Sequence, residues 1–374
     1  MMTININNML EQVRTYSRKE LKEVASRYDQ TEEFPAEHIQ YLIGLGILEL
    51  MVVAEAERTA SYKEFLRIIR IVSKQFPAVG SILLTQATYG IWPLYNFGTT
   101  EQKATYLDKL IKGDMYASFA INEESVGSDL EELETVAIEK DDHWEITGQK
   151  AYISNSPIAS LFFIVAKTRS LNGQESHGVF LVEKTVEGLT VGPLENKMGI
   201  KSLPVAGLTM TSVKVPKDNL LGGIIQGVKQ VESVVNRNRL AISAQAIGIS
   251  QGALERGLEY VSFERNFGKR LIDLQATQYK LADVQTRILS TRAFLLQTVD
   301  EAPFDTQQVS MLKLASSNVA IETTETIIDV TGGYGYMRNN EIERFVRDAK
   351  LTSIYGSSSN TQRKIIAQPW LSKI

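Results

Sequence analysis

Two short stretches near the middle of the chain carry polar and aromatic residues in patterns that can hold a ligand. In "AINEESVGSD", the neighbours Gly127 and Ser128 offer backbone N–H groups and a hydroxyl to an acceptor-rich molecule. In "GQKAYISN", the alternation of side chains along a strand places Tyr152 and Ser154 on the same side. Taken alone, the two stretches fit an ordinary polar turn and an ordinary strand equally well.

Two further stretches lie near the C-terminus. "SIYGSSSNTQRK", residues 353–364, is rich in small residues and hydroxyls and contains no carboxylate and no histidine. "DVTGGYGY" places Gly332, Gly333 and Gly335 at the end of an expected helix, where they either cap the helix or let the backbone approach a phosphate or an adenine. This is not a dinucleotide fingerprint, because no strand precedes the glycines.

Composition excludes several kinds of site. The 374-residue chain has no cysteine, which removes disulfides, iron–sulfur clusters, zinc–thiolate sites and cysteine nucleophiles. Nothing in the sequence places His38, His143 and His177 together, so we expect neither a histidine metal site nor a Ser–His–Asp triad. A net charge of −4 without a basic block argues against binding to nucleic acid.

The chain also lacks the patterns that target a protein to a membrane. No stretch approaches the ~20 apolar residues of a membrane span, and the N-terminus has no signal-peptide pattern. We therefore expect a soluble, cytoplasmic protein, and any difficult redox chemistry must come from a bound organic cofactor.

The periodicity of apolar residues divides the chain into three zones. Residues 1–116 are mostly of helical pattern, residues 117–226 form short β-rich runs, and residues 227–374 return to long helices. Short turns between the β runs favour an antiparallel sandwich or barrel over βαβ units. Apolar stripes in the last zone predict a helical bundle, and the groove between sheet and bundle is the natural place for a ligand.

Two helix boundaries can be predicted from capping residues. "TTEQKATYLDKLIKG" predicts a helix that begins at a threonine cap and ends at Gly113. Asp305 and Gln308 form a capping pair that predicts the start of a later helix.

The order of these stretches resembles the acyl-CoA dehydrogenase family over essentially the full length of the chain. "AINEESVGSD" is similar to the family's "TEP-x-AGSD", and "GQKAYISN" to "G-x-K-x-WITN". "FGKRLIDLQATQYKLAD" resembles "FGKP…Q…Q…LAD", and "GGYGYMRNNEIERFVRDAKLTSIYGSSSNTQR" resembles "GG-x-GY…ERL-x-RDAK…IYEGTSEIQR". The resemblance implies an α+β fold with an N-terminal helical domain, a central antiparallel β domain and a C-terminal four-helix bundle.

The resemblance also implies a cofactor, partners and site residues. The cofactor is FAD, with its ring between sheet and bundle, and the substrate is an acyl thioester carried by CoA or by an acyl carrier protein. A separate electron acceptor and a homodimer or homotetramer are implied, because neighbouring subunits of the family share FAD. Arg239 and Tyr355 match substrate-binding positions. The cofactor-binding positions are Phe119, Ile121, Asn122, Gly127, Ser128, Tyr152, Ser154, Arg265, Phe267, Gln275, Asp329, Gly332, Gly333, Ser358 and Asn360.

The chain departs from the family at the positions of the catalytic base. Most members carry a glutamate after the tyrosine of "IYEG", where this chain has Gly356. Other members carry it just before an arginine of the bundle, where this chain has Asn238. Two cofactor positions also depart, since Glu264 stands at an arginine position and Asp329 at a glutamine position.

Three hypotheses for the function follow. The first is an FAD-dependent oxidoreductase acting on a carrier-protein-bound biosynthetic unit whose chemistry does not need the missing glutamate. The second is an acyl-CoA dehydrogenase with a relocated base, because a general base contributes ~10²–10⁴-fold to the rate. The third is a non-catalytic subunit that retains the fold.

Overall fold

The computed structural model describes residues 6–125, 130–264 and 268–371. Four of the expected cofactor-binding residues, Gly127, Ser128, Arg265 and Phe267, lie outside the described residues.

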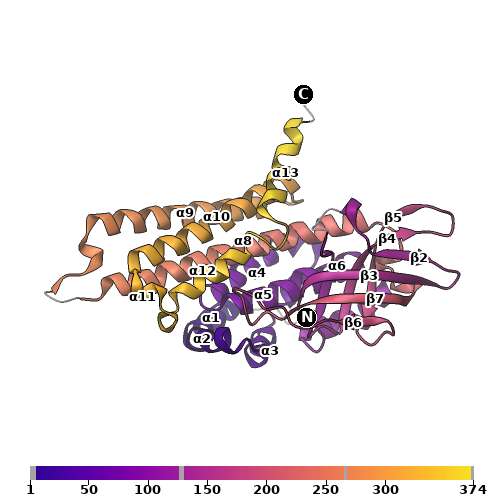
Figure 1. The fold of residues 1–374 in the computed structure, drawn as a ribbon, viewed down its shortest axis with the longest axis horizontal. Coiled ribbons are helices and arrows are strands. Elements are labelled where there is room, and N and C mark those ends of the chain that lie inside the picture. Colours follow the sequence, from indigo (N-terminus) through magenta and orange to yellow (C-terminus); the bar gives the residue numbers. More distant parts are fainter. Residues whose placement is uncertain (1–5, 126–129, 265–267, 372–374) are drawn as a thin grey trace.

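The first part of the chain is helical (Figure 1). A π-helical turn (Ser17–Leu21) joins the first two helices, and a second one (Gln86–Ile91) joins α5 to α6. The helices are α1 (Ile6–Tyr16), α2 (Lys22–Thr31), α3 (Ala36–Gly44), α4 (Arg58–Ser73), α5 (Pro77–Thr85), α6 (Trp92–Phe97) and α7 (Thr100–Lys112).

The capping residues of α7 act as the sequence predicts. Thr99 Oγ1 accepts a hydrogen bond from the backbone N–H of Gln102 at 3.2 Å, and Gln102 Oε1 accepts one from the backbone N–H of Thr99 at 3.1 Å. The helix ends at Gly113, whose φ of 74° is a left-handed conformation that glycine adopts without strain.

A single sheet of seven strands occupies the middle of the chain, with β1-β4-β2-β3-β7-β6 as its order and β5 paired to β4. The strands are β1 (Ala117–Ala120), β2 (Val136–Glu139), β3 (His143–Ser154), β4 (Leu161–Arg169), β5 (Glu175–Glu183), β6 (Leu189–Val191) and β7 (Val205–Pro216).

The sheet is mixed, whereas the sequence predicts an antiparallel one. β1 and β2 both run parallel to β4, with Ala117 opposite Leu161 and Val136 opposite Lys167. The two short strands therefore follow one another along the same edge of β4. Apolar runs identify strands but do not reveal their direction, which is set by the connections between them.

The last part of the chain forms a four-helix bundle of α8 (Gly227–Ser262), α9 (Gln275–Asp300), α10 (Thr306–Thr331) and α12 (Ile342–Leu351). The short helix α11 (Gly333–Tyr336) lies at one end of the bundle, and α13 (Ser359–Leu371) projects from the body (Figure 1). Asp305 Oδ2 accepts a hydrogen bond from the backbone N–H of Gln308 at 2.9 Å, which confirms the predicted cap of α10.

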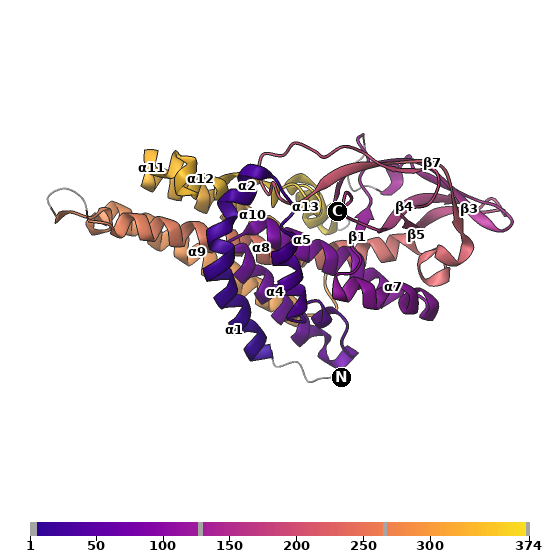
Figure 2. The same cartoon turned by 90° about the horizontal axis from the view of Figure 1, so that it is seen from below.

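The N-terminal helices pack directly against α8, and Figure 2 shows α4 and α5 beside it. A Cβ added to Gly248 would lie 2.5 Å from the backbone oxygen of Arg70, and one added to Gly252 would overlap the backbone oxygen of Lys74. Glycine at these two positions therefore lets the backbones of α4 and α8 approach closely.

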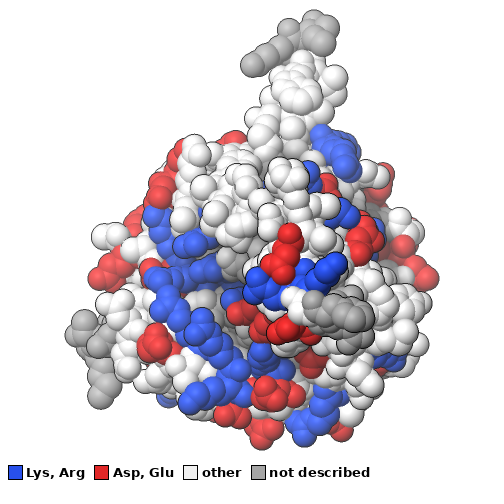
Figure 3. Space-filling model, turned by 90° about the vertical axis from the view of Figure 1, so that its left-hand side faces the viewer, with Lys and Arg blue, Asp and Glu red and all other residues white. Residues whose placement is uncertain are grey.

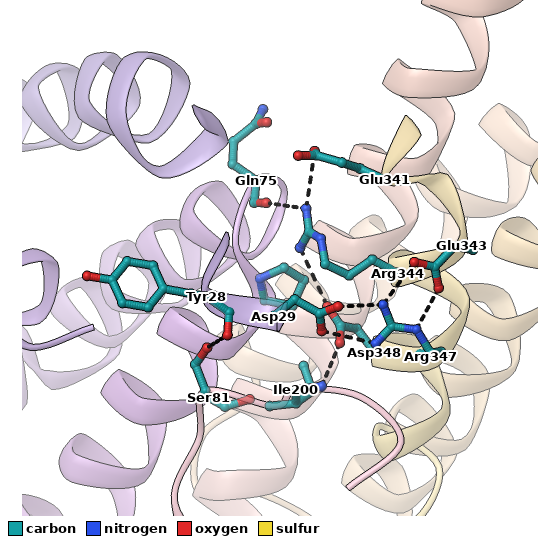
Figure 4. Close-up of polar contacts among 12 residues, drawn as sticks. Tyr28, Asp29, Gln75, Ser81, Ile200, Glu341, Glu343, Arg344, Arg347 and Asp348 are labelled. Atoms are coloured by element: carbon teal, nitrogen blue, oxygen red, sulfur yellow. Dashed lines mark hydrogen bonds and ion pairs between the residues drawn. The ribbon is translucent and has the colours of Figure 1, made fainter. Parts of the chain in front are cut away.

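Helix α12 is tied to the other two parts of the chain by buried charges (Figure 4). Arg347 donates to both carboxylate oxygens of Asp29 on α2, at 3.0 and 2.6 Å. Asp348 Oδ1 accepts a hydrogen bond from the backbone N–H of Ile200 at 2.5 Å, and Arg344 donates to the backbone oxygen of Gln75 at 3.3 Å. These contacts fix the end of α12, from which the 353–358 loop leaves.

In the described part of the chain, every helix is too short or too polar to span a lipid bilayer.

Candidate active site between the sheet and the bundle

Two buried basic residues, one on α8 and one on α10, hold the loop that joins α12 to α13. Arg239 on α8 donates from Nε to the backbone oxygen of Gly356 at 3.1 Å and from Nη2 to Ser357 Oγ at 3.3 Å. Lys313 on α10 donates to the backbone oxygen of Ser357 at 2.8 Å. The two cations therefore set the path of the loop at Gly356, where the sequence resemblance predicts the position of a base.

The structure brings Gly356 and Asn238 together. Asn238 Nδ2 donates to Thr88 Oγ1 at 2.8 Å, and Thr88 in turn donates to the backbone oxygen of Leu84 at 2.7 Å. This pairing turns Asn238 Oδ1 toward Gly356, where it would lie 3.3 Å from a Cβ added to the glycine. Asn238 Oδ1 is fully buried and has no hydrogen-bond partner among the residues that the structure describes.

The two positions are thus neighbours in space, and neither side chain can take up a proton. Gly356 has a φ of 63°, and a Cβ added to it would lie 2.5 Å from Ile242 Cδ1. An apolar methyl group and a neutral amide therefore fill the place where a carboxylate would act.

Burial lowers the pKa of both cations beneath the loop. Desolvation lowers the pKa of Arg239 to about 10, which leaves it charged at neutral pH. Desolvation, followed by the nearby charge of Arg239, lowers the pKa of Lys313 to about 7. A guanidinium in this position favours negative charge that develops near the loop.

A chain of neutral hydrogen bonds lies beside the loop. The Tyr355 hydroxyl donates to Gln245 Oε1, and Gln245 Nε2 donates to Ser81 Oγ at 2.7 Å and to the backbone oxygen of Pro77 at 2.8 Å. Desolvation raises the pKa of Tyr355, so its phenol stays neutral. Tyr355 is therefore a neutral hydrogen-bonding group beside the loop and not a base.

A cavity of about 220 Å³ opens beside Arg239 and Ser357. It brings β1 and α8 together, because Ile121 follows β1 and lies in the same wall as Val235 and Glu232. Glu232 is the carboxylate of this lining, and its Oε1 accepts a hydrogen bond from Thr306 at 2.7 Å. The remaining lining residues are Leu130, Val228, Val231, Thr306 and Ile365.

Tyr152 differs from the conformation that its sequence pattern predicts. The pairing of β3 with β7 shifts register between Lys150 and Ile153, and Tyr152 has a φ of 58°. Strict alternation with Ser154 is therefore broken by a bulge, and the Tyr152 side chain is 59% exposed. A strained, exposed aromatic residue on a strand is typical of a position that covers a ligand.

A large cleft of about 730 Å³ borders Tyr152 on the sheet. The ring of Phe119 does not face this cleft. It is buried in the core, where it stacks between Tyr89 and Phe163 at centroid distances of 5.6 and 6.0 Å. Asn122 is exposed and Ser154 half-buried, so both present polar groups at the same end of the sheet.

The other expected cofactor residues lie at the far end of the molecule. Gln275 begins α9, and Asp329, Gly332 and Gly333 lie where α10 meets α11, at the opposite end of Figure 1 from the strands. All four are exposed, and a Cβ added to Gly332 or Gly333 would meet nothing within 4 Å. The expected site is therefore divided between two ends of one chain.

Ser358 and Asn360 lie at the start of α13, after both of these groups in the sequence. Ser358 Oγ accepts a hydrogen bond from the backbone N–H of Thr361 at 3.3 Å, so Ser358 caps the helix. Asn360 Oδ1 accepts one from Arg363 at 3.2 Å, and both residues are exposed.

Comparison with known proteins shows the family. Models for the N-terminal, middle and C-terminal domains of acyl-CoA dehydrogenases match residues 5–114, 118–213 and 226–371. The chain belongs to the acyl-CoA dehydrogenase family. It is therefore a flavin oxidoreductase of acyl thioesters, and its cofactor is FAD.

Individual relatives match over nearly the whole chain. An acyl-CoA dehydrogenase of Bacillus subtilis is 32% identical over 96% of both chains, and the mitochondrial short-chain specific acyl-CoA dehydrogenase of Rattus norvegicus is 33% identical over 96% of this chain and 89% of its own. Butyryl-CoA dehydrogenase from Megasphaera elsdenii has a TM-score of 0.90 at 27% identity, with 99% of both chains covered. The prolyl acyl carrier protein oxidase AnaB has a TM-score of 0.89 at 25% identity, covering 99% of this chain and 100% of its own.

The arrangement of the described residues is compatible with a bound FAD. Tyr152 is exposed over a large cleft, and Ile121 borders the cavity beside the Gly356 loop. The open glycines at the bundle end leave room for a cofactor to approach the backbone.

Sequence patterns did not single out several residues of this site. Lys313, Gln245 and Thr88 are buried and hold the loop, the tyrosine and the asparagine in place. Only Lys313 carries a signal in the sequence, as a single lysine between leucines in "MLKLASS".

Proposed function

We propose that this chain is an FAD-dependent oxidoreductase of a carrier-protein-bound acyl unit in a biosynthetic pathway. The observation that carries the proposal is the contact between Gly356 and Asn238, two neutral residues at the two positions where the family places its base. An ordinary saturated acyl group must lose a proton from Cα, and no carboxylate is present there to accept it.

The polarity of the site supports a polar acyl unit. Asn238 Oδ1 is a buried acceptor without a partner, and an N–H or O–H group on the acyl unit would satisfy it. The hydrogen-bonded pair of Tyr355 and Gln245 is a second polar feature beside the Gly356 loop. AnaB, one of the solved structures with the same fold, is a prolyl acyl carrier protein oxidase.

The proposed mechanism assigns each residue a separate task. FAD, when bound, would supply the hydride acceptor, and the proton that the amino- or hydroxyacyl unit loses from its nitrogen or oxygen would pass to water. Arg239 holds the loop in place through the backbone oxygen of Gly356 and the hydroxyl of Ser357. Tyr355 remains neutral and orients the acyl unit by hydrogen bonding.

We propose that FAD is shared between subunits of a cytoplasmic homodimer or homotetramer. The residues expected to contact FAD lie at opposite ends of one chain (Figure 1), so a second copy is needed to complete each site. A separate electron acceptor would then reoxidise the flavin.

A second candidate is an acyl-CoA dehydrogenase with a relocated base. The observation that favours it is Glu232, whose carboxylate lines the cavity beside Arg239. Glu232 lies two helical turns before Arg239, on the same face of α8.

Anaerobic bleaching of the flavin distinguishes these candidates. We expect the wild type to be reduced by an amino- or hydroxyacyl unit on a carrier protein and not by butyryl- to octanoyl-CoA. Asn238→Glu should then raise reduction by the saturated acyl-CoA substrates at least roughly tenfold, because it supplies a general base.

Two other outcomes would support the alternative functions. Rapid reduction of the wild type by acyl-CoA, lost in Glu232→Gln, would establish the relocated base. Protein that retains no flavin when incubated with excess FAD would be a non-catalytic subunit.

A further inference from the structure

The bundle end of the molecule carries a concentration of positive charge outside the site described above. Figure 3 shows lysine and arginine side chains gathered in a band across this end. A cleft of about 670 Å³ lies between α1, α4, α8 and α9, and four basic residues line it: Arg14, Arg18, Arg70 and Lys74. Gln251 is the first residue of α8 that lines this cleft. It lies about 18 Å along the helix from Arg239, at 1.5 Å per residue, so the cleft is separate from the candidate active site.

The basic side chains that line this cleft come from α1, from the π-helical turn that follows it and from the C-terminal end of α4. Arg67, Arg70 and Lys74 follow one another at helical spacing on a single face of α4. Desolvation, followed by the charges of Arg292, Arg67 and Arg14, lowers the pKa of Arg70 to about 10. Arg70 therefore lies in the positive field of three other arginines, of which Arg14 also lines the cleft.

The carboxylates of the cleft neutralise only part of this charge. Glu255 already pairs with Lys74 at 3.0 Å, and Glu259 pairs with Lys22 at 3.3 Å. The guanidinium of Arg70 donates to the neutral amide of Gln251 at 2.7 Å. Within the described ranges, Arg18 and Arg292 make no hydrogen bond and no ion pair.

A buried hydroxyl in the same cleft also lacks a partner. Ser17 is 1% exposed, and its Oγ has no hydrogen-bond partner among the described residues. It lies in the cleft wall at the first position of the π-helical turn between α1 and α2. Such turns occur often at functional sites, and an unsatisfied buried hydroxyl costs about 1–3 kcal/mol.

We infer that this cleft binds a small phosphate-bearing anion, held by Arg18, Arg70 and the Ser17 hydroxyl. Guanidinium groups match the oxygens of a phosphate in pairs, and a serine hydroxyl supplies a third donor. A bound dianion would relieve the repulsion among the arginines. The volume of the cleft lies within the range of small-molecule sites, so both a free phosphate and a nucleotide fit.

Titration calorimetry on the FAD-loaded protein tests this site. Inorganic pyrophosphate and ADP are titrated separately at constant ionic strength, with pantetheine, which carries no phosphate, present in excess to occupy the thioester site. We expect one anion to bind per chain. Arg70→Gln and Arg18→Gln should each weaken binding roughly tenfold, the loss of one charge-assisted contact.

Arg287→Gln is the matched control, because Arg287 lies on α9, is largely exposed and pairs with Glu322. Arg18 is exposed as well, so Arg18→Gln preserves the fold if Arg70→Gln does not. Tighter binding of ADP than of pyrophosphate would identify a nucleotide, and equal affinity would identify a free phosphate.

Three outcomes would overturn the inference. The first is no heat with either anion. The second is unchanged affinity in both Arg18→Gln and Arg70→Gln, which would place the anion elsewhere. The third is a change of mass in light scattering on Arg18→Gln without anion binding, which would assign the cleft to carboxylates of a second copy.

Discussion

Position 356 shows how a single residue decides the chemistry of this site. Its φ of 63° is left-handed, and Ile242 lies against the space where a side chain would begin. Glycine is free of strain in this conformation, whereas any other residue must displace Ile242. The absence of a carboxylate is therefore built into the packing around the loop.

We expect Gly356→Ala to lower the free energy of unfolding by about 1–3 kcal/mol, because the new methyl group adds backbone strain and a contact with Ile242. Urea unfolding followed by circular dichroism measures the change. Gly333→Ala is the control, since its Cβ would meet nothing within 4 Å. Equal stability of the two variants would contradict the packing described here.

Lys313 should make stability depend on pH. Burial lowers its pKa in the folded protein to about 7 from an ordinary value of 10.5. The unfolded chain then binds more protons between these values, so the contribution of Lys313 to stability is present above pH 10.5 and is lost as pH falls to about 7.

Lys313→Met removes this titration. We expect the wild type to gain stability relative to Lys313→Met between pH 7 and pH 9.5, by at most about 1.4 kcal/mol per pH unit. Denaturant unfolding at the two pH values measures it. A difference that stays constant with pH would show that Lys313 is charged throughout.

At the scale of elements, α12 links the three parts of the chain. Arg347 reaches Asp29 on α2, while Asp348 holds the backbone of Ile200 (Figure 4). The loop with Gly356 starts one turn beyond α12. Movement of this helix would therefore displace the loop and the backbone groups that Arg239 contacts.

Arg347→Met should destabilise the protein by about 3–5 kcal/mol, because it leaves two largely buried carboxylates, Asp29 and Glu343, without their partner. Arg287→Met, which breaks an exposed pair with Glu322, should cost at most about 1 kcal/mol. Thermal and urea unfolding of both variants measure the contrast. Similar losses in the two would argue against the link.

At the scale of the whole molecule, the long axis separates the two halves of the expected cofactor site. Tyr152 lies on the sheet and Gly333 at the tip of the bundle, at opposite ends of Figure 1. In a two-fold dimer, each site would combine the sheet of one chain with the bundle tip of its partner.

Mixing two defective chains tests this arrangement. Tyr152→Ala and Gly333→Trp should each retain little FAD. In an equal mixture refolded together, half of the dimers contain both chains and half of their sites are intact, so roughly one quarter of sites should recover FAD. Flavin absorbance per chain measures recovery, with light scattering to confirm the dimer or tetramer. A mixture no better than its components would refute shared sites.

Sequence by itself determined the helical and β-rich zones, their order and the residue types at positions 238 and 356. Capping residues and apolar periodicity are local properties, so α7, α10 and the change from helix to strand follow from neighbours in the chain. The identity of residues 238 and 356 likewise needs no structure, because a residue type alone excludes a carboxylate there.

Only the tertiary structure decided which residues meet. The parallel pairing of β1 and β2 with β4 depends on connections, and the bulge at Tyr152 depends on the pairing of β3 with β7. Asn238 and Gly356 are more than a hundred residues apart in the sequence, and Lys313 on α10 contacts Ser357, the residue after Gly356. Such contacts arise from long-range packing, for which a local pattern carries no information.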